Sequence, residues 1–169
     1  GSLERGGVAR SLQRATDVRR RYYVDSKEYH DVGLGRGNFI SVSNRSNQVR
    51  VISSNHHGNP NWDVLHSDGY IERATTFYID SSGAPVLVGV RLVRGVNYVW
   101  LMKYSSTGQL LWEGTDSEPG CTAFAVVAAQ NGNIWVAASC ADGGRYPARL
   151  MLFNSAGHYI WSQNYTEGG

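Results

Sequence analysis

The sequence lacks any long apolar run and carries almost no excess of charge. No stretch of about 18 consecutive apolar residues occurs in the 169 residues, which excludes a membrane-spanning helix within them. The formal net charge is only +2, and the basic excess is confined to residues 1–30. The rest of the chain therefore has no electrostatic footprint for a polyanion, and we expect neither a nucleic-acid partner nor a membrane span.

Sequence motifs that carry catalysis or hold cofactors are missing as well. The chain has no Gly-x-Ser-x-Gly elbow, no HExxH helix, no P-loop and no CxxC pair. We therefore predict no catalytic residues, no metal ligands and no cofactor, and hence a protein that is not an enzyme. A hydrolase site around Asp63, Asp68 or the neighbouring histidines is the least favoured hypothesis.

Cysteine is scarce, because only Cys121 and Cys140 occur. They lie at opposite ends of a predicted hairpin whose turn is Asn131-Gly132. With Gln130 facing Asn133, the two cysteines become diagonal neighbours on one face, close enough for a disulfide. The alternative is two ordinary half-buried thiols. A disulfide fits the extracytoplasmic location that we expect, whether secreted, periplasmic or at the cell surface.

Glycine and aromatic residues, in contrast, are abundant. The chain has 20 Gly, 10 Tyr and 5 Trp in a hydrophobic content of 41%. This composition is typical of a globular, turn-rich chain built from many short strands. The length suits a single domain with a real core.

One short pattern, Gly-x-x-x-Trp, recurs three times: Gly58 to Trp62, Gly108 to Trp112 and Gly157 to Trp161. The glycines are 50 and then 49 residues apart, and self-similarity at a fixed period of this size indicates a repeat architecture. Each copy predicts a strand, a polar turn closed by the glycine, and a second strand that contains the tryptophan.

The segments between these copies also resemble one another. Residues 76–89 (TFYIDSSGAPVLVG) match residues 124–138 (FAVVAAQNGNIWVAA), and residues 31–43 form a degenerate version. Each reads as a hairpin. The predicted β-repeat domain, residues 31–169, thus divides into a half unit 31–46, units 47–96 and 97–145, and a half unit 146–169, with about twelve strands in total.

The tryptophan-centred units resemble bacterial β-propeller repeats of the quinoprotein type, and the best match is LMKYSSTGQLLWE at residues 101–113. The resemblance implies a mainly β fold of about three four-stranded units, with the tryptophans packed between units. It does not imply quinone binding. Three units are fewer than the usual four to eight of a propeller. Either the chain assembles with a copy of itself as a homo-oligomer, or the alternative fold, a β-trefoil, applies.

The N-terminal region has a different pattern. Residues 1–2 (Gly-Ser) are typical of a cloning scar. In residues 3–30 the spacing of Val8, Leu12, Ala15, Val18 and Tyr22 predicts a short basic amphipathic helix.

Two features depart from the repeat and are therefore candidate ligand-binding positions, because the scaffold alone does not require them. The first is the polar turn of the first copy, with His56, His57, Asn59, Asn61 and Asp63. The alternative for this turn is an ordinary polar hairpin. The second is the pair of non-repeating tryptophans, Trp100 and Trp135, which suit sugar stacking or a partner surface.

The sequence therefore predicts a noncatalytic extracytoplasmic recognition or adhesion module that binds a glycan or a protein through a β-repeat scaffold. The alternative is a structural or assembly subunit of a surface filament or envelope complex. Fold alone does not choose the ligand.

Overall fold

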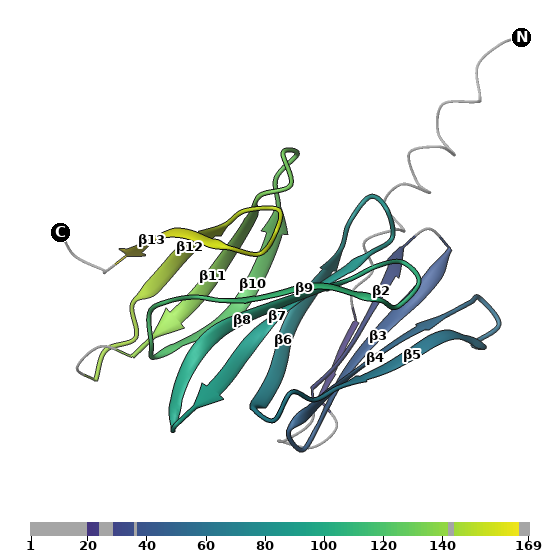
Figure 1. Cartoon of the computed structure of the whole chain (residues 1–169), viewed down its shortest axis with the longest axis horizontal. Coiled ribbons are helices and arrows are strands. Elements are labelled where there is room, and N and C mark those ends of the chain that lie inside the picture. Colours follow the sequence, from purple (N-terminus) through teal and green to yellow (C-terminus); the bar gives the residue numbers. More distant parts are fainter. Residues whose placement is uncertain (1–19, 24–28, 36, 142–143, 166–169) are drawn as a thin grey trace, which may run out of the picture.

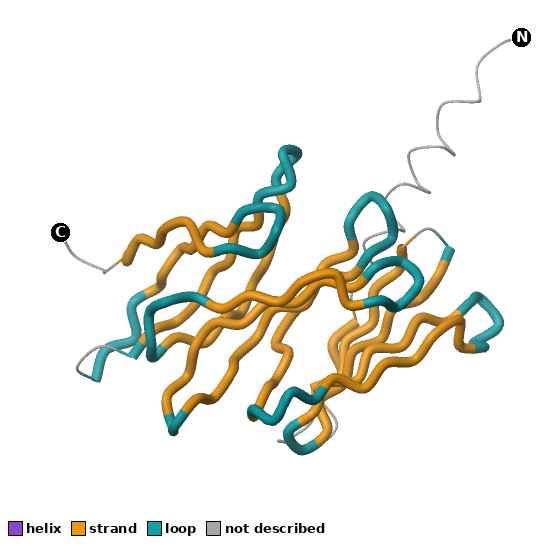
Figure 2. Tube along the Cα trace, viewed as in Figure 1, coloured by secondary structure: helices purple, strands orange, loops and turns teal. Residues whose placement is uncertain are grey.

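The protein is described by a computed structural model that covers residues 20–23, 29–35, 37–141 and 144–165. Strands dominate these residues, which contain no helix (Figure 2). The strands are β1 (Arg20–Tyr23), β2 (Tyr29–Gly35), β3 (Asn38–Arg45), β4 (Gln48–Ser54), β5 (Pro60–His66), β6 (Ile71–Ile79), β7 (Pro85–Val93), β8 (Val96–Tyr104), β9 (Leu110–Thr115), β10 (Cys121–Ala128), β11 (Ile134–Cys140), β12 (Ala148–Phe153) and β13 (Tyr159–Tyr165). The prediction of a mainly β fold is confirmed.

The strands form three antiparallel sheets, each made of strands that follow one another in the chain. The first sheet has the order β1-β2-β3-β4-β5, the second β6-β7-β8-β9 and the third β10-β11-β12-β13. Figure 1 shows the three sheets side by side, with the second between the other two. Because the sheets are separate and do not join into one closed barrel, the β-trefoil alternative is wrong.

The sheets are offset by half a repeat from the units counted along the sequence. Each sheet combines a hairpin of the intervening type with the Gly-x-x-x-Trp hairpin that follows it, so residues 31–46 share the first sheet with β4 and β5. Strands β2 to β13 supply the twelve expected strands, and β1 is added at the edge of the first sheet.

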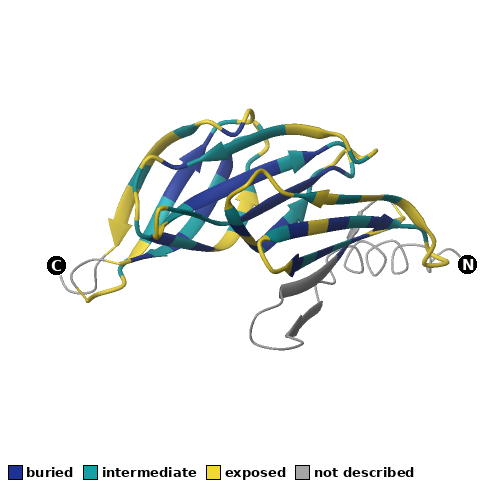
Figure 3. Cartoon of the chain, turned by 60° about the horizontal axis from the view of Figure 1, so that its bottom comes forward, coloured by how far each residue is buried: buried dark blue, intermediate teal, exposed yellow. Residues whose placement is uncertain are grey.

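Two apolar cores lie between the sheets, one between the first and second sheets and the other between the second and third. In β4, Val49 and Val51 are fully buried while Arg50 between them is exposed, the alternation of a strand with one covered face. In β7, residues 85–89 are buried without a break, because the second sheet is covered on both faces. Figure 3 shows the buried residues concentrated where one sheet faces the next.

The repeated tryptophans connect neighbouring sheets. Trp62 of the first sheet packs on Gly108 of the second, so that a Cβ at Gly108 would lie 2.8 Å from the indole Cδ2, and the indole Nε1 donates to the Ser106 carbonyl at 2.9 Å. Trp112 of the second sheet packs in the same way on Gly157 of the third. A turn residue with a side chain would obstruct this contact, and both glycines have positive φ (87° and 81°).

Buried polar groups add two further connections between the sheets. The Asn44 side chain of β3 accepts from the Ala74 amide at 2.9 Å and donates to the Ala74 carbonyl at 2.8 Å, so it pairs with β6 much as a neighbouring strand would. The Thr75 hydroxyl donates to the Ala123 carbonyl of β10 at 2.6 Å. These bonds fix each sheet relative to the next.

The predicted N-terminal helix is wrong where the structure can test it. Residues 20–23 and 29–30 lie in strands β1 and β2, which pair with each other from Arg20 opposite Val32 to Tyr23 opposite Tyr29. Tyrosine-rich segments favour strands. The remaining positions of the predicted helix, and the cloning scar at residues 1–2, lie outside the described residues.

The predicted disulfide is present, but with a different register. Cys121 and Cys140 are bonded with their Cα atoms 4.0 Å apart and lie directly opposite each other rather than diagonally. The register differs from the predicted one in two places. Beside the turn, Ala128 pairs with Ile134, one residue away from the register in which Gln130 faces Asn133, and a β-bulge between Ala123 and Ala125 shifts the pairing by one more residue on the cysteine side. Bulges of this kind are not encoded in the turn residues from which the register was predicted.

Candidate functional site

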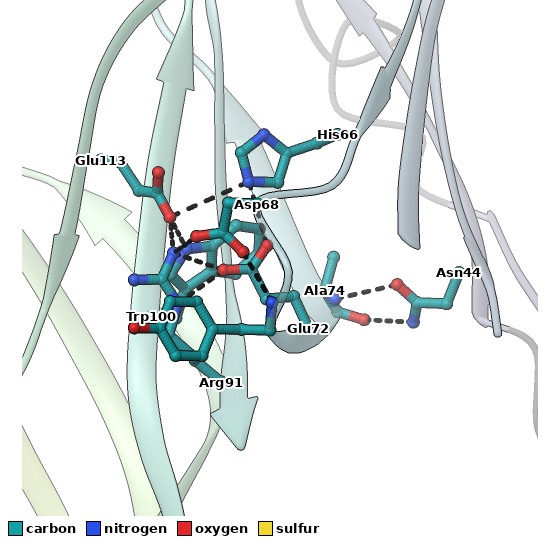
Figure 4. A network of polar contacts seen from close by, with 9 residues as sticks. Asn44, His66, Asp68, Glu72, Ala74, Arg91, Trp100 and Glu113 are labelled. Atoms are coloured by element: carbon teal, nitrogen blue, oxygen red, sulfur yellow. Dashed lines mark hydrogen bonds and ion pairs between the residues drawn. The ribbon is translucent and has the colours of Figure 1, made fainter. Parts of the chain in front are cut away.

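A cluster of polar side chains lies between the first and second sheets, and we call it the polar cluster (Figure 4). His66 ends β5 of the first sheet, and Asp68 lies in the connection from β5 to β6. Glu72, Arg91 and Glu113 come from β6, β7 and β9 of the second sheet. Strands β6, β7 and β9 of the second sheet, strand β5 of the first sheet and the β5–β6 connection therefore each contribute one side chain to the polar cluster.

Sheet register explains why these side chains meet. Glu72 and Arg91 are directly opposite each other on neighbouring strands. Gly89, two residues from Arg91, is opposite Trp100, and Met102, two residues from Trp100, is opposite Glu113. Since side chains two apart share a face, the charged groups and Trp100 all project from the face that meets the first sheet.

Arg91 is at the centre of the polar cluster. Its Nε donates to Glu72 Oε1 at 2.6 Å and its Nη2 donates to Asp68 Oδ2 at 2.8 Å, while Nη2 also pairs with Glu113 Oε1. The guanidinium carbon lies 4.9 Å from the centre of the Tyr70 ring, a cation-π distance. One cation thus holds one oxygen of each of the three carboxylates.

The floor of the polar cluster is deeply buried. Glu72 is 1% exposed and Trp100 is fully buried, with its indole Nε1 donating to Glu113 Oε1 at 2.7 Å. The His66 side chain is 10% exposed. Its Nε2 lies 3.0 Å from Glu72 Oε2, an ion-pair distance, and is shielded from solvent. The imidazole therefore faces the Glu72 carboxylate inside the polar cluster.

The charges of the polar cluster do not balance. Three carboxylates face one guanidinium and one imidazole, so the acidic groups outnumber the basic ones. The field extends to Tyr104, where burial, helped by the charge of Glu72, raises the phenol pKa to about 12. The site therefore favours cations and hydrogen-bond donors over anions.

Four of these residues could also ligate a metal. His66, Asp68, Glu72 and Glu113 each present one ligand atom, and these atoms lie within 4.8 Å of one another. However, the Arg91 guanidinium already pairs with an oxygen of all three carboxylates. A divalent ion beside that guanidinium would be repelled by it, so we assign Arg91 as the cation that the carboxylates hold.

The polar cluster opens to solvent on one side. The Tyr70 residue is 45% exposed, and the Asp68 and Glu113 side chains are 28% and 24% exposed. In Figure 4 the second carboxylate oxygen of Glu113 points away from Arg91. The rim thus offers an aromatic ring beside carboxylate acceptors, above a rigid buried floor, which is an arrangement suited to binding.

The polar turn predicted from the sequence lies elsewhere. His56, His57 and Asn59 are exposed in the turn between β4 and β5, where the two imidazole centres are 3.8 Å apart. Asn55 shapes this turn, because its Oδ1 accepts from the amides of His57 at 2.9 Å and Asn59 at 3.1 Å. The structure thus shows an Asx-stabilised hairpin turn.

The other two residues of that prediction lie on β5. The Asn61 side chain contacts the Ser53 hydroxyl at 3.4 Å. Asp63 pairs with Arg50, Nε to Oδ1 at 2.9 Å, and this hydrogen bond lowers the pKa of the Asp63 carboxyl. Asp63 projects from the face of the first sheet opposite to the polar cluster, because it pairs with Ile52 while His66 pairs with Val49.

The two non-repeating tryptophans are far from equivalent. Trp100 is fully buried, so it cannot stack on a ligand and serves instead as the wall of the polar cluster. Trp135 is half-buried on the third sheet, where its ring meets Trp161 edge to face with centres 5.5 Å apart. The structure therefore brings Trp100, but none of the other predicted site residues, to the polar cluster.

Sequence reasoning did not identify the polar cluster as a site: it considered Trp100 only as a stacking or partner residue and Asp68 only as a hydrolase candidate. Glu72 and Arg91 gave no usable signal, because they lie outside the predicted hairpin of residues 76–89. They are opposite each other only through the β-bulge between Ala74 and Thr76. His66 and Glu113 carry no signal either, because only the packing of the first sheet on the second brings His66 to the others.

Comparisons with known proteins leave the chain without a family. No family model matches it, and no curated protein matches its sequence. Among solved structures, a protein of unknown function from Bacteroides caccae is similar over 85% of this chain and 84% of its own, with 12% identity and a TM-score of 0.32.

Proposed function

We propose that this chain is a noncatalytic recognition module that binds a glycan at the polar cluster. The observation that carries the proposal is the combination of an exposed aromatic ring, Tyr70, with the partly exposed carboxylates of Asp68 and Glu113 over a buried, fixed floor. A sugar presents an apolar C–H face to an aromatic ring and hydroxyl donors to carboxylates. The rim of the polar cluster offers both kinds of partner.

The charge of the site narrows the glycan class. The polar cluster has three carboxylates and one guanidinium. Hydroxyl and ammonium groups of a sugar can donate to the partly exposed carboxylates of Asp68 and Glu113, whereas uronic acids would be repelled. The proposed ligands are therefore amino sugars first and neutral sugars second.

The disulfide supports an extracytoplasmic location. Bonds such as that between Cys121 and Cys140 persist in oxidising compartments. No helix among the described residues is long and apolar enough to cross a membrane. A recognition module outside the cytoplasm would meet glycans at cell surfaces or in the surroundings of the cell.

Binding measurements with three defined oligosaccharides test the proposal. A glucosamine hexamer should bind most tightly, cellohexaose more weakly and a galacturonate hexamer not at all. Glu113→Gln keeps the shape of the rim but removes a charge, and it should weaken binding of the glucosamine hexamer more than that of cellohexaose. Asp63→Asn, on the opposite face, is the matched control and should change neither. Preference for the acidic oligomer, or no binding of any of the three, would reject the proposal.

A second candidate function, assembly, is favoured by a different observation. Five large hydrophobic side chains on the strands of the third sheet are exposed: Phe124, Val127, Ile160, Trp161 and Tyr165. Tyr146, in the connection between β11 and β12, is exposed as well. Exposed apolar surface of this extent is typical of a protein interface. In a propeller-type arrangement, which the repeat resembles, each sheet is covered by the next one, whereas within the described part of the chain this sheet has a neighbouring sheet on one face only.

A further inference from the structure

The packing of a repeat tryptophan on a turn glycine of the next sheet occurs twice, and it leaves one repeat tryptophan and one turn glycine without such a contact. Trp62 packs on the Gly108 turn and Trp112 packs on the Gly157 turn, each connecting one sheet to the next. Among the described residues, no further sheet covers Trp161 of the third sheet. No described tryptophan packs on Gly58 of the first sheet, and nothing lies within 4 Å of the position that its Cβ would take.

The Trp161 end is an apolar row. Val127, Trp135, Leu152 and Trp161 pair in register across all four strands of the third sheet, so they share its uncovered face. Val127 is 59% exposed and Trp161 is 37% exposed. Trp112, the equivalent of Trp161, is half-buried against the core between the second and third sheets. Trp161 therefore lacks the cover that its equivalents have.

The Gly58 end has the matching geometry. Gly58 has φ of 82°, the same turn conformation as Gly108 and Gly157, whose φ values are 87° and 81°. It is exposed, whereas Gly157 is buried under Trp112. Phe39, Ile52 and Leu65 lie on the face of the first sheet that no other described sheet covers, together with the Arg50–Asp63 pair; Phe39 is 40% and Leu65 53% exposed.

We propose that two copies of this chain associate head to tail, with Trp161 of each copy packed on the Gly58 turn of the other. By analogy with Trp62 and Ser106, the Trp161 indole Nε1 donates to the His56 carbonyl, which has the equivalent place in the turn. The third sheet of one copy then covers the first sheet of the other. This inference deepens the assembly function and is independent of any ligand at the polar cluster.

Two such contacts close a ring. Each copy contributes three sheets, so the pair has six, within the usual range of about four to eight for closed sheet rings. The two contacts are equivalent by two-fold symmetry, and each buries the unmatched tryptophan of one copy and the unmatched glycine of the other. In this ring both Trp161 side chains and both Gly58 turns are covered, so this type of contact adds no third copy.

Sedimentation equilibrium of the full chain tests this proposal. The chain has a mass of 18.6 kDa, and the expected species has twice that mass. Trp161→Ala and Gly58→Ala should each weaken dimerisation at least about tenfold, since tryptophans at interface centres dominate binding. Leu111→Ala, another exposed hydrophobic residue (51%) on the second sheet, is the control and should leave the dimer intact.

A mixture of the two variants gives the sharpest readout. Neither variant can form the contact with itself, but the Trp161→Ala copy keeps Gly58 and the Gly58→Ala copy keeps Trp161, so the mixed pair forms one contact. Dimer should reappear on mixing, with circular dichroism confirming that both variants are folded. A monomeric wild-type chain, an undiminished Trp161→Ala dimer, or open-ended polymers would each overturn the proposal. Loss of glycan binding in a chain that still dimerises would count only against the glycan site.

Discussion

The Trp112 indole occupies the space that a side chain at Gly157 would need, since a Cβ there would lie 2.4 Å from Cε3 of the ring. Gly157→Ala should therefore lower the free energy of unfolding by about 2–4 kcal/mol, through a left-handed alanine and through overpacking. Gly95→Ala is the matched control, because Gly95 has φ of 84° but open space around it. It should cost only about 1 kcal/mol. Urea unfolding measures both losses. An equal loss of stability in Gly157→Ala and Gly95→Ala would show that the packing of Trp112 does not require a glycine at position 157.

Arg91 should be needed mainly to neutralise Glu72, which is 1% exposed. Arg91→Met leaves that carboxylate buried without its cation, and we expect a loss of about 3–5 kcal/mol. Because the loss comes from an unpaired charge, Arg91→Met combined with Glu72→Gln should recover a large part of it. Urea unfolding of the two single variants and the double variant measures this coupling. Additive losses would mean that Arg91 and Glu72 act separately.

Asp116 should make the protein less stable as the pH rises. Burial raises the pKa of its carboxyl from 3.8 to about 7, against a smaller opposing effect of the hydrogen bond from the Val99 amide. A raised pKa in the folded state means that stability is greatest below pH 3.8 and is lost progressively up to about pH 7. The loss contributed by this group should be about 2–4 kcal/mol.

The Asp116→Asn variant isolates that effect. It keeps an oxygen for the Val99 amide and removes the titrating proton. Its urea stability should equal that of the wild type at low pH and exceed it at pH 8. Parallel stability curves for the two proteins between these limits would contradict the pKa shift.

The disulfide should stabilise the third sheet appreciably. It closes a loop of 19 residues, for which the chain-entropy estimate is about 3 kcal/mol. Denaturation with and without dithiothreitol measures the difference, and the intact mass under nonreducing conditions should be lower than that of the reduced chain by two hydrogen atoms. A mass equal to that of the reduced chain would show that the thiols are free.

Much of the fold was predictable because the repeat is local. The turns at Gly58, Gly108 and Gly157 have the positive φ that the Gly-x-x-x-Trp pattern suggests, and strands lie on both sides of each turn. The repeat could not show where one sheet ends and the next begins. That division depends on whether a Gly-x-x-x-Trp hairpin pairs with the hairpin before it or with the one after it. The two hairpin types alternate along the chain, so the sequence is equally compatible with both choices.

The site was less predictable, for a physical reason. The histidine turn was predicted as a binding site because its sequence differs from those of the equivalent turns. In the structure the Asn55 side chain stabilises this turn by accepting hydrogen bonds from the amides of His57 and Asn59. His66 and Glu113 are 47 residues apart and approach only because the first sheet packs on the second, with Nε2 to Oε1 at 3.9 Å. Trp100 departs from the repeat because it supports Glu113, not because it faces a ligand.

Isothermal titration of the glucosamine hexamer tests the central claim, that the rim of the polar cluster is the binding site. The wild type should bind with measurable heat, and Tyr70→Ala should lose at least about tenfold in affinity because the stacking ring is removed. Tyr146→Ala removes a ring that is 73% exposed in the connection between β11 and β12, and it should bind like the wild type. Equal affinity of Tyr70→Ala and the wild type would contradict the account, because the ligand would then bind away from this rim.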